Sequence, residues 1–392
     1  MRMKREHQLI PDYEERAGIY HCVSRFVLKS YLMDDMGKEY MRVIMRKYEA
    51  FCGVRVLTYC MMSNHIHLLV EVPPKQDAEL ILDAPDEEFL NRLRFVYSED
   101  YVTQLGERFE KSRSDATESD AQGLTNDEGV SAGELSELYI HEIKRPFVLR
   151  MCDLSAFMKS IKQCFSQWYN RENGVKGTLW ESRFKSELVQ SGYAAQTVAA
   201  YIDLNPLRAN MVADPKDYRW CGYAEAVAGN KEAQLGLLSV MQGVEKVVPN
   251  VELLGDLSNS WKGVMGDYRM VLAVDGKAAD LDAVLVRGER KSARYKKHMG
   301  FSREESERIL ESGGKLRRAE LLRCRVRHFS DGVVLGSKEF VNGFFQRLKN
   351  SAQDDPNYQG QYEKRRTGAR KVNAMSGDPL FSLRDLKKDT LS

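Results

Sequence analysis

The sequence has no long hydrophobic run and no paired cysteine motif, and both absences narrow the kinds of protein it encodes. No stretch of the 392 residues approaches the roughly 20 apolar residues that cross a membrane. Residues 1–16 are basic and polar, without the apolar segment of a signal peptide. The seven cysteines are scattered and form no Cys-x-x-Cys pair, so they do not indicate a disulfide framework or a zinc knuckle. We therefore expect a cytoplasmic protein with reduced thiols.

The sequence also lacks a P-loop and helicase motifs, so we expect no nucleotide cofactor. The net charge of +2 looks neutral, but it is unevenly distributed. Residues 76–140 hold 17 acidic and 5 basic residues, a local charge of −12, so the rest of the chain carries +14. A basic body of this kind favours a polyanionic partner such as nucleic acid.

The first part of the chain has the pattern of a β-α-β-β unit. Strand composition at 19–27 is followed by helical spacing at 34–51, a second strand at 54–62 and a third that ends at Pro73-Pro74. Helical spacing returns at 153–173 and 193–204. We predict an α+β fold with a ferredoxin-like antiparallel sheet and helices on one face, followed by a mostly helical C-terminal extension.

Composition divides the chain into three parts. Residues 1–230 form the first predicted domain, interrupted at 76–140 by an acidic, partly disordered insertion. Within it, Lys111 to Gly133 is predicted to be a disordered or mobile loop. Residues 231–300 give no clear pattern beyond a linker or uncertain helical region. Residues 301–392 are helical and basic, and three short helices within 302–348 resemble a helix-turn-helix module or a helical tail that packs on the core.

The most informative stretch is Met62-Ser63-Asn64-His65-Ile66-His67, which leads into a strand. Side chains alternate between the faces of a strand, so His65 and His67 point the same way while Ile66 and Leu68 point to a core. Two neutral imidazoles on one rigid face can hold a divalent metal. The alternative is a chance His-x-His pair on a structural strand.

A second group of residues lies near position 201. Tyr201 and Asn205 are spaced by four and share a helix face, and a basic aromatic stretch, Trp180 to Lys185, precedes them. A tyrosine hydroxyl is a weak nucleophile at neutral pH, but a metal that withdraws charge from a phosphate makes the attack feasible. A histidine pair that can hold a metal, a tyrosine and phosphate-binding cations together indicate phosphoryl transfer through a covalent intermediate.

Residues 10–228 resemble the REP-associated tyrosine transposases, a branch of the single-tyrosine HUH transposases. Four ordered stretches carry the resemblance: 20–25 (YHCVSR), 62–70 (MSNHIHLLV), 177–186 (GTLWESRFKS) and 201–209 (YIDLNPLRA). The resemblance implies an enzyme that nicks and rejoins single-stranded DNA near palindromic hairpins through a 5′-phosphotyrosine intermediate. It also implies Mg2+ or Mn2+ as the cofactor and a homodimer.

On this sequence the resemblance makes Tyr201 the nucleophile and His65, His67 and Asn205 the metal ligands. We interpret His21 as a structural or DNA-contacting residue and not as a ligand. The predicted DNA contacts are phosphate-binding cations and one base-stacking ring: Arg25, Trp180, Arg183, Lys185 and Arg208.

Other functions remain open. A rolling-circle initiator nuclease would use the same chemistry, although the chain has no helicase motif to go with it. A regulator derived from a transposase could bind nucleic acid without cleaving it, although it would not need both histidines and Tyr201. A zinc hydrolase is a further option, but no third Cys or His stands at ligand spacing.

Overall fold

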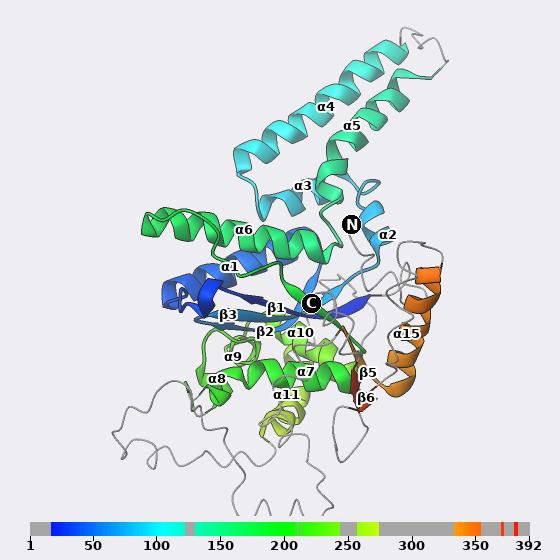
Figure 1. Ribbon diagram of the computed structural model, residues 1–392. Coiled ribbons are helices and arrows are strands. Elements are labelled where there is room, and N and C mark those ends of the chain that lie inside the picture. Colours follow the sequence, from blue (N-terminus) through cyan, green and yellow to red (C-terminus); the bar gives the residue numbers. More distant parts are fainter. Residues whose placement is uncertain are drawn as a thin grey trace, which may run out of the picture.

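The computed structural model describes residues 17–121, 130–209, 211–212, 214–243, 257–273, 333–353, 370–371 and 380–382. Its centre is a seven-stranded sheet with the order β2-β3-β1-β4-β5-β7-β6. Helical layers lie above and below this sheet, and a helical hairpin projects from the upper layer (Figure 1). Among the described residues, no helix is both long enough and apolar enough to cross a membrane.

Four strands form the predicted ferredoxin-like core. All neighbours among them are antiparallel, and the order β2-β3-β1-β4 places the first strand in the middle. The bounds are β1 Gly18–Arg25, β2 Arg55–Met62, β3 His65–Val72 and β4 Lys185–Val189. The predicted α+β class is thereby confirmed, and the basic aromatic stretch from Trp180 to Lys185 leads into β4.

The two helices of the upper layer have the capping residues that their sequences suggest. The Asp34 carboxylate accepts from the Gly37 N–H at 2.8 Å, and helix α1, Asp35–Cys52, ends at Gly53 with a left-handed φ of 67°. Asp153 caps α6, Leu154–Asn173, in the same way. Apolar side chains of both helices pack against Ile66, Leu68 and Val70 of β3 in one large core. A short 3-10 helix, η2 Val27–Lys29, links β1 to this layer.

A second helical layer covers the lower face of the sheet, so helices lie on both faces and not on one. Leu57, Cys60 and Leu69 point from the sheet into this second core. Gly236 lies so close to β2 that an added Cβ would meet the Leu57 carbonyl oxygen at 2.6 Å. The elements of this layer are α7 Tyr193–Asp203, α8 Asn205–Arg208, η3 Pro215–Asp217, α9 Gly222–Val227, α10 Lys231–Gln242 and α11 Leu257–Ala273.

Helices continue to pack on the sheet beyond the predicted domain boundary at residue 230. Helix α10 begins at Lys231 and packs directly on β2, because Gly236 permits close approach to the strand backbone. Trp261 and Tyr268 of α11 are buried in the same core. Where residues 231–300, interpreted as a linker or uncertain helical region, are described, they are helical and pack in this core.

The acidic insertion is largely helical where it is described. It contains α2 Lys75–Glu79, α3 Asp86–Arg94, α4 Glu99–Ala121 and α5 Ala132–Val148, of which α4 and α5 form the projecting hairpin (Figure 1). Residues 111–121, predicted to be disordered, continue α4. The remaining part of that prediction, at residues 122–129, lies outside the described residues.

Polar contacts explain why a stretch poor in large apolar residues still forms a helix. Arg113 of α4 contacts Asp86 and places its Nε 2.6 Å from the Glu137 carboxylate of α5. The Asp120 carboxylate accepts from the Ala132 and Gly133 N–H groups at 2.7 and 2.9 Å, which satisfies donors at the start of α5. Composition alone did not reveal these pairings, because the partners lie on two different helices.

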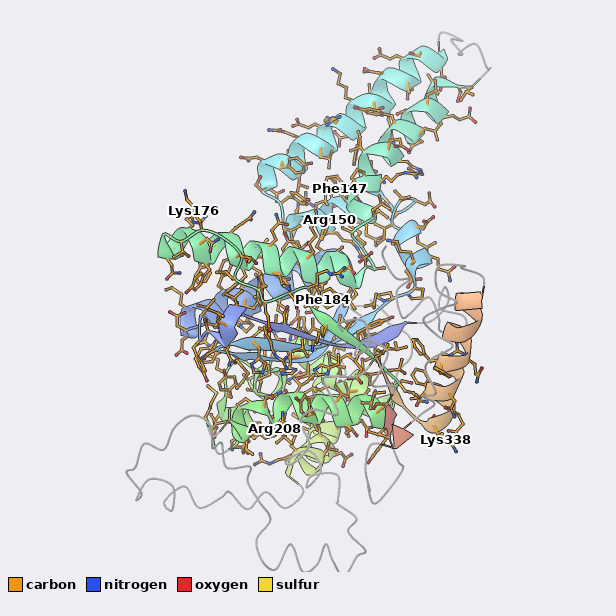
Figure 2. All side chains as sticks on the ribbon, viewed as in Figure 1. Phe147, Arg150, Lys176, Phe184, Arg208 and Lys338 are labelled. Carbon is orange, nitrogen blue, oxygen red and sulfur yellow. The ribbon has the colours of Figure 1, made fainter. Side chains whose placement is uncertain are left out.

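An aromatic cluster fixes the base of the hairpin to the body. Arg150 donates to the Tyr97 hydroxyl at 2.7 Å and lies 4.8 Å from the Phe51 ring centroid. Phe147 packs against Tyr97 and Phe89, with ring centroids 5.5 and 5.8 Å apart. Figure 2 shows Phe147 and Arg150 at the junction between the hairpin and the upper layer.

The C-terminal region extends the sheet. Strand β5, Val334–Gly336, is parallel to β4, and β7, Phe381–Ser382, links it to β6, Arg370–Lys371. The helix predicted after Ser337 is confirmed as α15, Lys338–Gln353, and the Ser337 hydroxyl oxygen accepts from the Phe340 N–H at 3.2 Å. The other two helices of the predicted helix-turn-helix module lie outside the described residues.

Candidate functional site

The two histidines of β3 lie on the lower face of the sheet, as the alternation predicted. Directly paired residues of antiparallel strands point to the same face. Lys185 of β4, Val23 of β1, His67 of β3 and Cys60 of β2 therefore form one row across the sheet. The next row on this face of the sheet contains Arg25 and His65, which are also paired.

A hydrogen bond joins His67 to a third histidine on the neighbouring strand. Nδ1 of His67 lies 2.9 Å from Nε2 of His21, and their rings stack with centroids 5.1 Å apart. His67 and His21 are only 3% and 1% exposed. Nδ1 of His65 lies 2.5 Å from the amide oxygen of Asn64, and the His65 side chain is half-buried. The sheet therefore gathers three imidazoles into one group.

Helix α7 carries Tyr201 to this group. The Tyr201 ring centroid lies 5.8 Å from that of His67 and 5.9 Å from that of His21, both in edge-to-face contact. Tyr201 is only 1% exposed. The structure thus joins the two groups of residues that the sequence placed about 135 positions apart, and it covers the tyrosine.

Arg208 covers the other side of the tyrosine. Its guanidinium lies 4.1 Å from the Tyr201 ring centroid and donates to the Asn205 amide oxygen at 2.7 Å. The Asn205 amide nitrogen donates to the Tyr201 and Ile202 carbonyls at 3.3 and 3.2 Å, where α7 ends. The predicted ligand Asn205 therefore holds Arg208 over the tyrosine in this structure. Figure 2 labels Arg208, the last residue of the short helix α8.

His67 is neutral at ordinary pH. Burial, together with the nearby His65, His21, Arg208 and Arg25, holds the pKa of His67 well below its usual value of 6.5. A neutral imidazole retains one nitrogen lone pair, which a metal ligand requires.

The predicted DNA-binding cations are not all close to the tyrosine. Arg25 is paired in register with His65, and its positive charge helps to lower the pKa of His67. Arg25 therefore lies at the site. Lys185 is exposed and lies two strands from His67 in the same row. Arg183 is also exposed, but it precedes β4 and no described contact links it to the histidines. Arg25, Lys185 and Arg208 are therefore the cations that the fold places around the site.

Trp180 cannot stack on a base in this structure, which corrects the sequence prediction. It is 8% exposed and stacks on Phe26 with centroids 4.5 Å apart. Its indole N–H donates to the Ser166 hydroxyl at 2.9 Å. A bridge between Phe26 and Trp180 extends the pairing beyond β1, so the ring belongs to the upper core.

Asp203, which the sequence interpretation did not single out, joins the end of the tyrosine helix to the sheet and to two other helices of the lower layer. Its carboxylate accepts from the Thr58 hydroxyl of β2 at 2.8 Å and from the Tyr268 hydroxyl of α11 at 2.5 Å. A third bond comes from the Tyr223 N–H at 3.2 Å. The sequence did contain a signal for this role, because Asp203 is the acidic residue of a mostly apolar helix. A buried carboxylate is almost always paired, so its position indicated hydrogen-bond partners.

Asp203 is expected to make stability depend on pH. Burial raises the pKa of its carboxyl to about 7, and the bonds from Tyr268, Thr58 and Tyr223 lower it only in part. Because the folded pKa exceeds the unfolded value, the native state binds this proton more tightly. The free energy of unfolding contributed by this group therefore falls between about pH 4 and pH 7, by up to roughly 4 kcal/mol.

Substituting Asp203→Asn removes the titrating proton and should flatten that part of the stability profile. Urea denaturation of both proteins between about pH 4 and pH 8 measures the two slopes. Equal slopes in the wild type and Asp203→Asn would contradict the assignment.

The donor set fits a divalent metal held by two protein nitrogens. Asn64 and His21 engage the Nδ1 atoms of His65 and His67, so Nε2 is the nitrogen that remains for a metal on each ring. Among the described residues, no three His, Cys, Asp or Glu side chains form a metal-binding group. A three-ligand zinc hydrolase site is therefore not found in this part of the chain. A cation here would complete its coordination with oxygen donors.

A comparison with protein families covers the strands that carry the three histidines of this site. Residues 16–88 match the family model described as "Transposase IS200 like". The resemblance to a transposase family is confirmed over this segment. The matched segment spans β1 to β3 and includes His21, His65 and His67, but it ends before Tyr201. No curated protein sequence matches the chain.

One solved structure is similar, under the description "Structure of the REP associates tyrosine transposase bound to a REP hairpin". It is 12% identical, with a TM-score of 0.31, and the match covers 55% of this chain and 81% of that chain. At this level of similarity it adds nothing to the family match.

Proposed function

We propose that the protein nicks and rejoins single-stranded DNA near palindromic hairpins, as a metal-dependent tyrosine transposase. The observation that carries this proposal is the edge-to-face contact between Tyr201 and His67, one of the two predicted metal-ligating histidines, with ring centroids 5.8 Å apart. A tyrosine beside the neutral imidazole of His67 and the guanidinium of Arg208 can attack a phosphodiester, because the neighbouring positive charge offsets charge on the phosphate.

The chemistry follows from the residues around Tyr201. Mg2+ or Mn2+ bound by His65 and His67, with Asn205 as the further predicted ligand, would withdraw charge from the scissile phosphate. The Tyr201 hydroxyl oxygen forms the new bond to phosphorus, and the bond from phosphorus to the 3′ oxygen breaks. The products are a 5′-phosphotyrosine and a free 3′-hydroxyl. Reversal with another 3′-hydroxyl rejoins a strand without ATP.

The burial of Tyr201 requires a movement before this reaction. The nucleophile is 1% exposed beneath Arg208, which is itself partly exposed on α8. A phosphate that attracts the guanidinium away from the ring would expose the hydroxyl and bring the phosphate beside it. Arg208 thus combines the predicted role of DNA contact with that of a cover over the nucleophile.

Arg208→Ala is expected to slow formation of the covalent adduct by about tenfold to a hundredfold, the usual effect of losing a hydrogen bond to a charged group. Single-turnover adduct formation on hairpin DNA measures the rate. Arg171→Ala is the matched control, since Arg171 is 76% exposed on α6. Faster adduct formation in Arg208→Ala would show that Arg208 only covers the tyrosine and does not bind phosphate.

The same burial favours a second candidate, a regulator that binds DNA without cutting it. One experiment separates the two functions. The protein is incubated with end-labelled single-stranded hairpin DNA and Mn2+, and an adduct that survives denaturation is sought. An adduct that EDTA prevents supports the transposase. DNA binding without an adduct across a range of hairpins supports the regulator.

The homodimer implied by the resemblance stays a prediction. Size-exclusion chromatography with light scattering, with and without hairpin DNA, tests it directly.

A further inference from the structure

The hydrogen bond between His67 and His21 can exist in two forms with opposite consequences for a metal. Either His67 Nδ1–H donates to His21 Nε2, or His21 Nε2–H donates to His67 Nδ1 across the 2.9 Å separation. In the first form, Nε2 of His67 has a free lone pair. In the second form, a neutral His67 carries its proton on Nε2 and cannot bind a metal there.

His65 shows which form the site requires. Its Nδ1 faces the amide oxygen of Asn64 at 2.5 Å, and an amide oxygen can only accept. His65 therefore carries a proton on Nδ1, and in its neutral form it presents Nε2 as the lone pair. His21 engages Nδ1 of His67, so Nε2 is the nitrogen of His67 that can reach a cation, and His67 then needs a partner that accepts at its Nδ1.

We propose that His21 is a positioning residue that accepts a hydrogen bond from His67 Nδ1–H and so holds His67 in the form that presents Nε2 to a divalent cation. This inference rests on the proposed metal-dependent function. His21 acts on the metal through His67, in the way that carbonyl and carboxylate partners orient histidine ligands in other metal sites.

The position of His21 in the sheet supports this role. It lies on β1, the strand between β3 and β4, and is 1% exposed. The stack with His67, with planes 18° apart, leaves little freedom to reorient the ring. Glu187 of β4 is directly opposite His21 and is also buried. The strand order and the ring stack therefore hold Nε2 of His21 toward Nδ1 of His67.

His21 is not itself a third ligand. Its Nε2 is directed at the Nδ1 atom of His67 and is occupied by that bond. The described residues contain no three-residue His, Cys, Asp or Glu metal group that would include it. Its contribution is to the orientation and protonation pattern of His67.

The test reads the protonation pattern without any metal. Full-length protein is labelled with 15N-histidine, which gives signals from seven residues, and His67 is assigned with a His67→Asn variant. We expect His67 Nδ1 to be protonated and Nε2 to be unprotonated in the metal-free wild type. A proton on Nε2 would overturn the proposal, whatever the catalytic activity.

Variants then test the effect on metal binding. His21→Phe keeps the ring stack but removes the acceptor, and should weaken Mn2+ binding about 10- to 100-fold, measured by EPR titration. His21→Gln restores an acceptor and should recover most of the affinity. Cys22→Ala, also buried on β1 but on the opposite face, is the control for damage to the strand and should leave affinity unchanged.

Two outcomes separate this inference from the proposed function. Unchanged Mn2+ affinity in folded His21→Phe would refute the role of His21 while leaving the transposase proposal intact. Failure of the wild type to bind Mn2+ would refute the metal-dependent function, and the nitrogen signals would still show whether His21 sets the form of His67. If His21→Phe does not fold, the wild-type signals and His21→Gln decide the question.

Discussion

Tyr201→Phe is expected to form no covalent adduct with hairpin-bearing single-stranded DNA, and to lose strand cleavage by on the order of 10⁴-fold or more. The substitution removes the one oxygen that can bond to phosphorus and leaves the ring in place. The ring packs against His21, His67 and Arg208, so the variant should keep its fold and its affinity for DNA. The effect should therefore appear in the chemical step alone.

Denaturing electrophoresis with end-labelled DNA detects the adduct, and fluorescence anisotropy measures DNA binding separately. Tyr193→Phe is the matched control, because Tyr193 begins the same helix and should retain activity. An adduct that persists in Tyr201→Phe would mean that another side chain is the nucleophile.

His65→Ala is expected to abolish the dependence of cleavage on Mn2+ and to slow adduct formation by about a thousandfold, because a metal at a phosphoryl oxygen contributes several kcal/mol. His65 is half-buried, and its hydrogen bond is to Asn64, the residue before it in the chain. Removing the His65 imidazole should therefore disturb the fold little. His67→Ala should have a similar effect on cleavage but should also lower stability, since His67 is 3% exposed and bonded to His21.

Adduct formation as a function of Mn2+ concentration measures this effect, and Mn2+ titration by EPR gives the affinity directly. His141→Ala provides the control histidine, since His141 lies on the projecting hairpin with a third of its side chain exposed. If His65→Ala cleaves at the wild-type rate with the same Mn2+ dependence, the histidine pair does not hold the metal.

Local patterns predicted the elements that hold the site. The alternation from His65 to Val72 fixed both the strand and the face on which the imidazoles lie. Helical spacing at 34–51 and 153–173 predicted α1 and α6, and the structure adds Asp34 and Asp153 as the carboxylates that cap their first turns. The spacing of Tyr201 and Asn205 placed both at one helix end, where the structure has them.

The errors arose where partners lie far apart in the chain. Polar composition at 111–121 suggested disorder, but Arg113 finds Asp86 and Glu137 on two other helices. Trp180 looked like a base-stacking residue from its basic neighbours, and its contact with Phe26 depends on the β1 pairing. The bond between His21 and His67 also depends on strand order, because β1 must lie beside β3. A pattern within one segment does not contain such information.

The parallel pairing of β4 with β5 has a consequence for biosynthesis. Val189 at the end of β4 pairs with Leu335, so almost 150 residues of chain are made between the two. Until Val334–Gly336 leaves the ribosome, β4 is an open edge strand with unpaired backbone groups, a site at which another nascent chain can add. The minimal folding unit therefore reaches beyond the catalytic residues, and chains truncated after α8 should be prone to aggregate even though they contain every proposed ligand and the nucleophile.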